Sequence, residues 1–282
     1  MIIFFSDGRL GNQIFQYAFL NTIAKRKEKI ITTNMQSFFS VFDCKNNNFK
    51  NYQPSKYQAA LIKLILKNIF YFLIKIHLIG YIKQNHNQQA ALSNTTTQSG
   101  LFPVTYIETN FFQSEIFFNP DMLDFRLKAH YVQNAQIILE TIPDQFEKIF
   151  VHLRRGDYLF ENYLGDRGID LPKQYFIKAI DEIKKEVKNP YFIFLSDDPH
   201  FVECCFEHIT DKYVSRNDMA TDLALMTLCD YGICSNSSFS WWGAYLMNNR
   251  KSVLMPKYWY GWKKKIESHI GIQPGWCKVI EI

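Results

Sequence analysis

Residues 149–158 read Ile149-Phe150-Val151-His152-Leu153-Arg154-Arg155-Gly156-Asp157-Tyr158, an apolar run that ends in two adjacent arginines. A short apolar run bounded by glycine and charge predicts a buried strand, and the carboxyl end of such a strand opens into a ligand crevice. Arginine suits phosphate there, because its planar guanidinium donates two parallel hydrogen bonds and stays protonated. The stretch therefore predicts an anion site. The alternative is a strand end with solvated arginines, one of them paired with Asp157.

The residues after 149 alternate between apolar runs and helical patterns. The predicted strands are 149–151, 191–195, 231–234 and 252–255, and the predicted helices are 172–187, 199–206, 219–228 and 239–247. This alternation predicts a parallel sheet with helices on both faces and ligands at the carboxyl ends of its strands. The chain opens with a similar unit, a strand over 2–5, a glycine loop over 6–11 and a helix with Asn12 as its N-cap.

The chain has 282 residues, a length that suits one large or two ordinary domains. We predict an α/β protein with an N-terminal domain over 1–148, which includes a helical and polar-loop region over 59–100. The C-terminal domain is predicted over 149–282.

The composition is that of a soluble globular protein, with 47% apolar and 21% charged residues. The net charge of +5 is too diffuse for a nucleic-acid binder but suits an anionic substrate or an anionic membrane surface. Six cysteines without metal-ligand spacing predict reduced thiols, a cytosolic protein and no zinc. The first residues have neither the basic nor the long apolar region of a signal peptide.

Residues 59–76 are apolar except for a few polar positions, among which Lys63, Lys67 and Lys75 recur at helical spacing. Two interpretations fit. The favoured one is a helix that covers the sheet of the first domain, and the other is a helix that lies along a membrane surface. The polar run 84–100 is predicted to be a surface loop.

Polar residues follow the other predicted strands as well. Ser196-Asp197-Asp198 follow the second strand, and Ser235-Asn236-Ser237-Ser238 come immediately before a helix. Hydroxyls and free backbone N–H groups at a helix start form an anion cradle. A plain N-cap explains only one of these four residues, so phosphate contact is favoured.

Two further features have structural alternatives. Asp222, in the first turn of a predicted helix, could accept hydrogen bonds from a guanine, but the residues alone favour compensation of the helix dipole. The Trp241-Trp242 pair is more typical of core packing than of sugar stacking. Since no Asp-x-Asp occurs, a sugar-nucleotide enzyme with this sequence would neutralise its leaving diphosphate with arginines and helix N-termini.

Three blocks together resemble the bacterial α-1,2-fucosyltransferases of glycosyltransferase family 11, which are related to the animal blood-group H enzymes. The first block is Gly8-Arg9-Leu10-Gly11-Asn12-Gln13 with the residues to 18, and the second is His152 to Tyr158. The third runs from Cys229 to Ala244 and contains Ser235-Asn236-Ser237-Ser238-Phe239-Ser240-Trp241-Trp242-Gly243. Residues 35–145 carry no such signature.

The resemblance implies a GT-B fold of two Rossmann-like domains, with the donor site in the C-terminal one and the acceptor held largely by the first. The implied reaction transfers L-fucose from GDP-β-L-fucose to O2 of a terminal β-galactoside, with inversion and with no metal or other cofactor. The implied donor contacts are Arg154 and Arg155 for the diphosphate, Ser237 and Ser238 for phosphate, and Asp222 for guanine. Further donor contacts are predicted at His152, Asp197, Asn236, Gly11, Asn12 and Gln13, and acceptor contacts at Asp7, Tyr158 and Trp241.

The catalytic base is an open point of this resemblance. The related α-1,6 enzymes place a candidate glutamate eight residues after the first arginine, and this chain has Asn162 there, with Glu161 beside it. The candidates are Asp157, Glu161 and Asp7, in that order. Asp157 also fits a structural role, as the partner that orients Arg154.

The predicted partners are GDP-fucose and a galactose-terminated oligosaccharide, without nucleic acid. The predicted location is the cytoplasm, with peripheral contact to the inner membrane, and the predicted role is bacterial surface-glycan (lipopolysaccharide O-antigen) synthesis. The alternatives are a fucosyltransferase of another linkage, a metal-dependent GT-A transferase and a non-catalytic carbohydrate-binding protein. The double-tryptophan block argues for the α-1,2 group, and the absence of Asp-x-Asp argues against GT-A.

Overall fold

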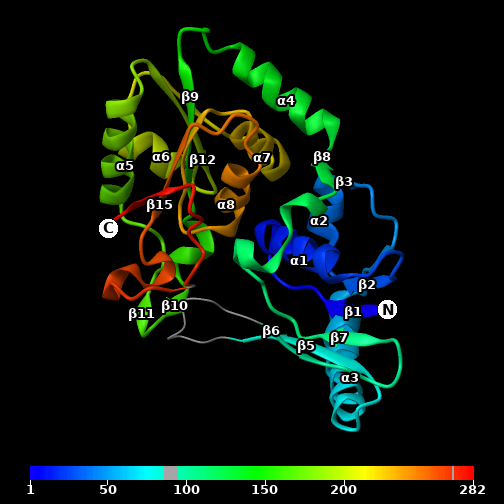
Figure 1. Ribbon diagram of the computed structural model, residues 1–282. Helices are drawn as coiled ribbons and strands as arrows, with labels where there is room; N and C mark the ends of the chain where they lie inside the picture. Colours follow the sequence, from blue (N-terminus) through cyan, green and yellow to red (C-terminus); the bar gives the residue numbers. More distant parts are fainter. Residues whose placement is uncertain (86–94, 269) are drawn as a thin grey trace. The chain divides into compact units, whose positions relative to one another are not determined.

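The computed structural model describes residues 1–85, 95–268 and 270–282, and for 56–64 it describes the backbone alone. The chain divides into two compact units (Figure 1). Unit 1 comprises Met1–Arg126 and Ile270–Ile272, and unit 2 comprises Leu127–His269 and Gln273–Ile282. The boundary thus lies at Arg126/Leu127 and not at the predicted 148/149. The reason is that helix α4 (Ala129–Glu140) packs against α7 (Met219–Thr227) of unit 2.

Unit 1 is built on a six-stranded sheet of order β4-β2-β1-β7-β5-β6, in which only β6 is antiparallel to its neighbour. Its strands are β1 (Ile2–Phe5), β2 (Ile30–Thr33), β4 (Phe49–Tyr52), β5 (Gly80–Gln84), β6 (Thr95–Gln98) and β7 (Thr105–Ile107). Its helices are α1 (Leu10–Ile23), α2 (Gln36–Val41), α3 (Lys56–Lys75) and the short η1 (Glu115–Phe117) and η2 (Pro120–Met122). The short strand β3 (Phe42–Cys44) follows α2, and β8 (Phe125–Leu127) spans the unit boundary.

Unit 2 contains a six-stranded, wholly parallel sheet of order β13-β12-β9-β14-β15-β16. Its strands are β9 (Glu147–Leu153), β12 (Pro190–Ser196), β13 (Lys212–Val214), β14 (Tyr231–Ile233), β15 (Ser252–Pro256) and β16 (Lys278–Ile280). Its helices, besides α4 and α7, are α5 (Lys173–Glu186), α6 (Pro199–Cys205), α8 (Ser238–Tyr245), η3 (Gly156–Leu159) and η4 (Trp259–Lys264). A small hairpin pairs β10 (Asn162–Tyr163) with β11 (Asp166–Arg167). The predicted parallel sheet and its four helices are confirmed.

The structure corrects two local expectations. Helix α1 begins at Leu10 with Arg9 as its N-cap, so Asn12 lies inside the first turn. The polar run 84–100 is not a loop throughout, because Thr95–Gln98 pairs with β5 as strand β6. The part of that prediction over 86–94 lies outside the described residues.

No helix in the described part of the chain is long and apolar enough to span a bilayer.

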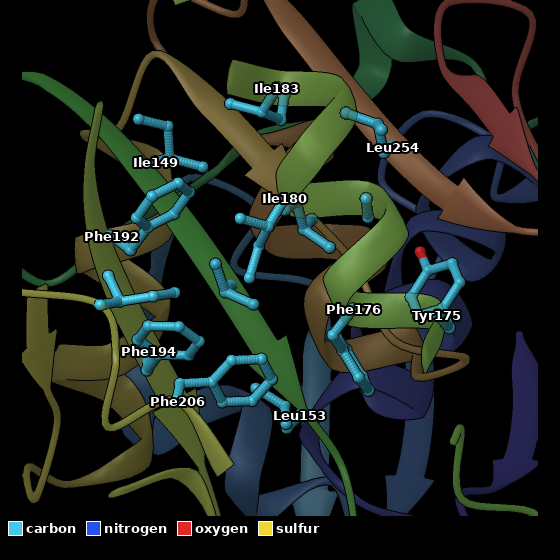
Figure 2. Packing of buried hydrophobic residues seen from close by; sticks show 14 of the residues in the cluster. Ile149, Leu153, Tyr175, Phe176, Ile180, Ile183, Phe192, Phe194, Phe206 and Leu254 are labelled. Carbon is cyan, nitrogen blue, oxygen red and sulfur yellow. The ribbon is translucent and has the colours of Figure 1, made fainter. Parts of the chain in front are cut away.

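One buried cluster of unit 2 lies between its sheet and α5. Ile180 and Ile183 point from α5 toward Ile149 of β9 and Phe192 of β12, as Figure 2 shows, and Phe176 of the same helix belongs to this cluster. These α5 positions repeat at three and four residues and therefore lie on one helix face, which is buried. Strands β9 and β12 pair in parallel along their whole length, with Ser196 opposite Leu153, so both strands end at the same place.

We expect Ile180→Val to lower the free energy of unfolding by about 1 kcal/mol, because a buried methylene is lost and leaves a small cavity. Ile177→Val, on the same helix but 37% exposed, should change it by less than about 0.5 kcal/mol. Urea denaturation of the full chain measures both. Equal effects would contradict the assigned orientation of α5.

Candidate active site

Four neighbouring strands of unit 2 end at one edge of its sheet. The pairing order is β13-β12-β9-β14, and all four strands run parallel, so the residues that follow them meet at that edge. These residues are Arg154 and Arg155 after β9, Asp197 and Asp198 after β12, Ser215 after β13, and Ser235 to Ser237 after β14. The carboxyl edge therefore carries both the arginines and the Ser/Asn loop that the sequence singled out.

Arg154 is held by two carboxylates. Its guanidinium pairs with Asp157 and with Asp197, where Nη1 and Oδ2 are 2.8 Å apart. The guanidinium carbon also lies 5.5 Å from the ring centre of Tyr158. Asp157 thus takes the position of a partner that orients Arg154, which was one of its two predicted roles.

Arg155 is held by a second pair of carboxylates. Its Nε lies 3.1 Å from Asp198 Oδ2, and its Nη1 lies 3.5 Å from Asp170 Oδ2. Its guanidinium carbon lies 3.4 Å from the ring centre of Phe201, and its backbone N–H donates to Asp197 Oδ1 at 2.9 Å. Both arginines are less than one-fifth exposed.

Four aspartates therefore surround two arginines, so this cluster of side chains does not carry a net positive charge. A guanidinium has five N–H donors, of which these carboxylates take two on each arginine. The carboxylates fix the planes of the two guanidinium groups in advance of any ligand. Such fixed donors suit an anion whose charge increases during a reaction, because they need no reorganisation.

Gly156 is a position where a side chain has no room. A Cβ there would lie 2.4 Å from Asp197 Oδ2, the carboxylate that contacts both Arg154 and the Arg155 backbone. The glycine between the arginines and Asp157 is thus explained by the close approach of Asp197.

We expect Gly156→Ala to lower the free energy of unfolding by about 1–3 kcal/mol, since Asp197 must move away and its contacts are lost. Gly275→Ala is the matched control, because nothing lies within 4 Å of a Cβ added there. The control should change the unfolding free energy by less than about 0.5 kcal/mol. Thermal or urea unfolding of both variants decides the point, and an unaffected Gly156→Ala protein would contradict it.

The loop after β14 is buried and ordered by its own hydrogen bonds. Ser237 is the N-cap of α8, and its Oγ accepts from the Phe239 N–H at 3.3 Å. The Asn236 side chain donates from Nδ2 to the carbonyl of Ile169 at 2.6 Å, and its buried Oδ1 has no hydrogen-bond partner within the described residues. Asn236 has no exposed surface, so the contact that the structure shows for it is the one that ties this loop to the Ile169 carbonyl. Ser238 is the half-buried first residue of α8.

His152 contacts the same loop from β9. Its Nδ1 lies 2.8 Å from Ser235 Oγ, and its ring packs against Phe239. Burial lowers the pKa of His152 to about 3, so the ring is neutral at working pH. His152 therefore contributes no positive charge to the predicted phosphate site and instead positions the Ser235 loop.

Asp222 lies in the first turn of α7, near the end of β13. Its carboxylate accepts a hydrogen bond from Ser215 Oγ. The N-cap of this helix is Asp218, whose side chain accepts from the N–H groups of Ala220 and Thr221. Burial raises the pKa of Asp222 to about 7, and the charge of Asp218 adds to the rise. The helix start is already capped by Asp218, so a second carboxylate that is largely desolvated is not explained by the cap alone.

The remaining predicted residues of unit 2 lie in different surroundings. The Tyr158 hydroxyl lies 3.0 Å from that of Tyr260 and donates to the Asn236 carbonyl at 3.4 Å. Glu161 is exposed beyond η3. Trp241 is fully buried and stacks on Tyr245, with ring centres 5.1 Å apart. A side chain with no exposed surface fits the core-packing interpretation and offers no face to an acceptor, contrary to the acceptor contact predicted for it.

The first block forms the carboxyl edge of the unit 1 sheet. Gly8 has a φ of +82°, and a Cβ there would lie 2.6 Å from Asn12 Nδ2. The exposed Asp7 follows β1, and its carboxylate accepts from the Gly8 N–H at 2.8 Å. Asn12 Oδ1 accepts from Gln113 Nε2 at 2.6 Å.

Two buried glutamines hold this edge together. Gln13 donates to the carbonyls of Gly8 and Asn34 and accepts from the Phe38 N–H. Gln16 accepts from Ser6 Oγ and donates to two further loop carbonyls. Gln13 thus fixes loops, whereas Gly11, which is buried in α1, offers only its backbone. These contacts favour a positioning role for Gln13 over the donor contact predicted for it.

Sequence reasoning missed Asp170 and Phe201 next to Arg155, and Ser215 next to Asp222. Among the described residues, no three His, Cys, Asp or Glu side chains are placed to hold a metal ion. The six cysteines form no disulfide.

The fold has solved counterparts. The chain superposes on the α-1,6-fucosyltransferase NodZ, from crystals soaked with GDP-fucose, with a TM-score of 0.51 at 10% identity. The superposition covers 87% of this chain and 92% of that one. Together with the two Rossmann-like units, this likeness defines the fold class as GT-B, as expected.

The family follows from the sequence. Residues 2–279 match the model of Glycosyl transferase family 11, and the chain belongs to this family. It is a glycosyltransferase, as predicted.

Named relatives agree with this membership. The O-antigen biosynthesis glycosyltransferase WbnK of Escherichia coli is 25% identical over 92% of this chain and 95% of its own length. An α-1,2-colitosyltransferase of Escherichia coli is 33% identical over 122 residues, which are 40% of this chain and 41% of that protein. The galactoside 2-α-L-fucosyltransferase SEC1 of Bos taurus is 24% identical over 86% of this chain. The match spans 63% of the bovine protein. This chain therefore covers less than two thirds of the length of the colitosyltransferase and of the bovine protein.

Proposed function

We propose that this protein transfers L-fucose from GDP-β-L-fucose to O2 of a terminal β-galactoside, with inversion. The observation that carries the proposal is the carboxyl edge of the unit 2 sheet, where Arg154, Arg155 and the N-terminus of α8 come together. The fold of unit 2 and the family membership support a nucleotide-sugar donor there. The named galactoside 2-α-L-fucosyltransferase supports the acceptor and the linkage.

In the proposed reaction the acceptor O2 attacks the anomeric carbon while the bond to the β-phosphate oxygen breaks, so GDP leaves as negative charge accumulates on it. Arg154 and Arg155 stabilise that charge with the N–H groups that their carboxylates leave available. The backbone N–H groups at the start of α8 do the same with the helix dipole. With these groups in place, the proposal requires no metal. Asp222 accepts the paired N–H donors of guanine.

The catalytic base stays a prediction. Asp157 is paired with Arg154 through Oδ1, so as a base it would have to accept the proton while it also holds that guanidinium. Glu161 and Asp7 are exposed, and an exposed carboxylate can accept the O2 proton when the acceptor covers it. The pH profiles of Asp157→Asn, Glu161→Gln and Asp7→Asn separate the three, because only loss of the base removes the acidic limb.

A second donor is favoured by one observation. The α-1,2-colitosyltransferase has the higher identity, 33%, over the part that it shares with this chain. GDP-colitose is therefore the alternative donor, with the same α-1,2 linkage. The proposed setting is bacterial O-antigen synthesis in the cytoplasm, which the name of the WbnK relative supports.

The test is to incubate the full chain with GDP-fucose, EDTA and either lactose or lacto-N-biose. The expected result is GDP release with a fucosylated trisaccharide, whose linkage NMR assigns to O2. If product forms in a parallel incubation with GDP-colitose but not with GDP-fucose, the donor is GDP-colitose. Absence of GDP binding would contradict the proposal, and activity that EDTA abolishes would refute its metal independence.

A further inference from the structure

Helix α3 carries apolar side chains on two faces, and only one of them packs on the sheet. Leu66, Phe70 and Leu73 pack with Ile74 against a buried cluster that includes Phe5 of β1 and Tyr106 of β7. Figure 1 shows the helix in cyan next to these strands. This inner face confirms that α3 covers the sheet of unit 1. It leaves the apolar residues of the other face unexplained.

The outer face of α3 is apolar and open to solvent. Ile65, Ile69, Phe72 and Ile76 are 49%, 46%, 62% and 46% exposed. They are spaced four, three and four residues apart, which places them in one stripe along the helix. The Ile76 N–H donates to the Phe72 carbonyl at 3.2 Å, so the helical spacing holds to the end of the stripe.

A second segment continues this stripe. Leu101 is 76% exposed and Phe102 is 54% exposed. Their backbone N–H groups donate to the carbonyls of His77 and Leu78, at 2.9 and 2.8 Å, directly after α3. The segment that carries these two exposed side chains is therefore held at the end of the helix. We call these six residues, Ile65, Ile69, Phe72, Ile76, Leu101 and Phe102, the outer apolar patch.

The chain around the patch has a one-sided charge. Residues 45–107 contain seven lysines and neither aspartate nor glutamate, whereas the rest of the chain has 25 basic and 27 acidic residues. Lys75 is exposed at the end of α3. The basic charge of the protein is thus concentrated in the segment that contains the patch.

We propose that the outer apolar patch binds a bilayer that contains anionic phospholipid. An amphipathic surface inserts exposed Phe, Leu and Ile side chains at the level of the lipid headgroups, while neighbouring lysines attract anionic lipid. A second copy of this chain is a poorer occupant, because two such surfaces would bring their lysines together, and the nearby carboxylate of Glu108 is already paired with Lys83. The proposal is independent of the donor and the acceptor of the reaction.

The test is co-sedimentation of the full chain with vesicles of phosphatidylcholine, either pure or with about 30% phosphatidylglycerol. We expect binding to the anionic vesicles that about 0.5 M NaCl weakens, and little binding to phosphatidylcholine alone. The double variant Phe72→Ser/Phe102→Ser should bind the anionic vesicles at least about tenfold more weakly, since both phenyl groups lose their burial in lipid.

The matched control is Ile137→Ser/Tyr52→Ser, which removes apolar groups that are 62% and 54% exposed outside the patch. The control should bind like the unmodified protein, and all variants should keep its rate of GDP release in solution. The proposal is overturned if the unmodified protein does not sediment with anionic vesicles, or if both double variants bind equally. It is also overturned if the patch variant instead changes the mass of the protein in solution, which would show that a second copy covers the patch.

Discussion

Arg155→Lys is expected to lower kcat about 100-fold or more, although the charge is kept. Lysine presents one ammonium in place of a planar fork, so it cannot contact Asp198 and Asp170 and still donate two parallel hydrogen bonds to a diphosphate. The stacking of the guanidinium on Phe201 is lost as well. The loss should fall on kcat more than on the donor KM, because the charge on GDP increases as the glycosidic bond breaks. Initial rates of GDP release measure both quantities.

The control is Arg216→Lys. Arg216 also contacts a carboxylate of the α6 region, Glu203, but its side chain is 67% exposed. We expect it to keep kcat within about twofold, as exposed ion pairs contribute little. Near-unmodified kinetics for Arg155→Lys, with the protein still folded by circular dichroism, would remove Arg155 from the mechanism. A loss confined to KM would make it a ground-state binding residue.

The central part of the fold was predictable because its strands are buried on both faces. Strands β9, β12, β14 and β15 each read as a continuous apolar run, and their predicted bounds differ from the observed ones by only a few residues. The edge strands β13 and β16 were not predicted. They are only three residues long, and neither reads as a continuous apolar run. The hydrogen bond of Ser215 to Asp222 was missed for the same reason, since Ser215 follows β13.

Single residues of the candidate site were predictable from the sequence, but the ion pairs between them were not. Arg154, Arg155 and Ser237 were found because each follows an apolar run or begins a helix. The carboxylates that hold the arginines could not be assigned, because Asp197 and Asp198 lie on another strand and Asp170 lies in a loop without periodicity. His152 was expected to contact the donor because it belongs to the block that follows the first predicted strand. Its burial, which leaves it neutral, is a tertiary effect that one sequence does not reveal.

The raised pKa of Asp222 has a consequence for the protein without substrate. The pKa of about 7 lies above the ordinary value of 3.8, so the folded state keeps a proton that the unfolded state releases between these values. The free energy of unfolding should therefore fall as the pH rises through this window and level off above about pH 7. Asp222→Asn should lack this contribution, which urea denaturation at pH 5 and pH 8 can measure.

Donor binding should depend on pH in the opposite sense. Guanine offers two adjacent N–H donors, and only the ionised carboxylate of Asp222 accepts both. We expect the Kd for GDP to be constant above about pH 7 and to rise about tenfold for each pH unit below it. Asp222→Asn should bind GDP about 30-fold or more weakly at pH 8, since a charge-assisted hydrogen bond contributes about 2–3 kcal/mol. Calorimetric titration at several pH values gives the Kd for GDP of the unmodified protein and of Asp222→Asn. The ionisation of GDP itself affects both proteins equally, so it cancels in the ratio of the two Kd values.

Two comparisons decide whether the carboxylate of Asp222 contacts the guanine of GDP. Inosine diphosphate lacks the 2-amino group, so it should bind the unmodified protein more weakly than GDP does, whereas Asp222→Asn should hardly distinguish the two. Asp218→Asn keeps a good N-cap residue but removes the charge that helps to raise the pKa of Asp222. It should shift the pH break downward and leave the affinity at pH 8 unchanged. If Asp222→Asn binds GDP as well as the unmodified protein at pH 8, the guanine site lies elsewhere, and the buried carboxylate is structural.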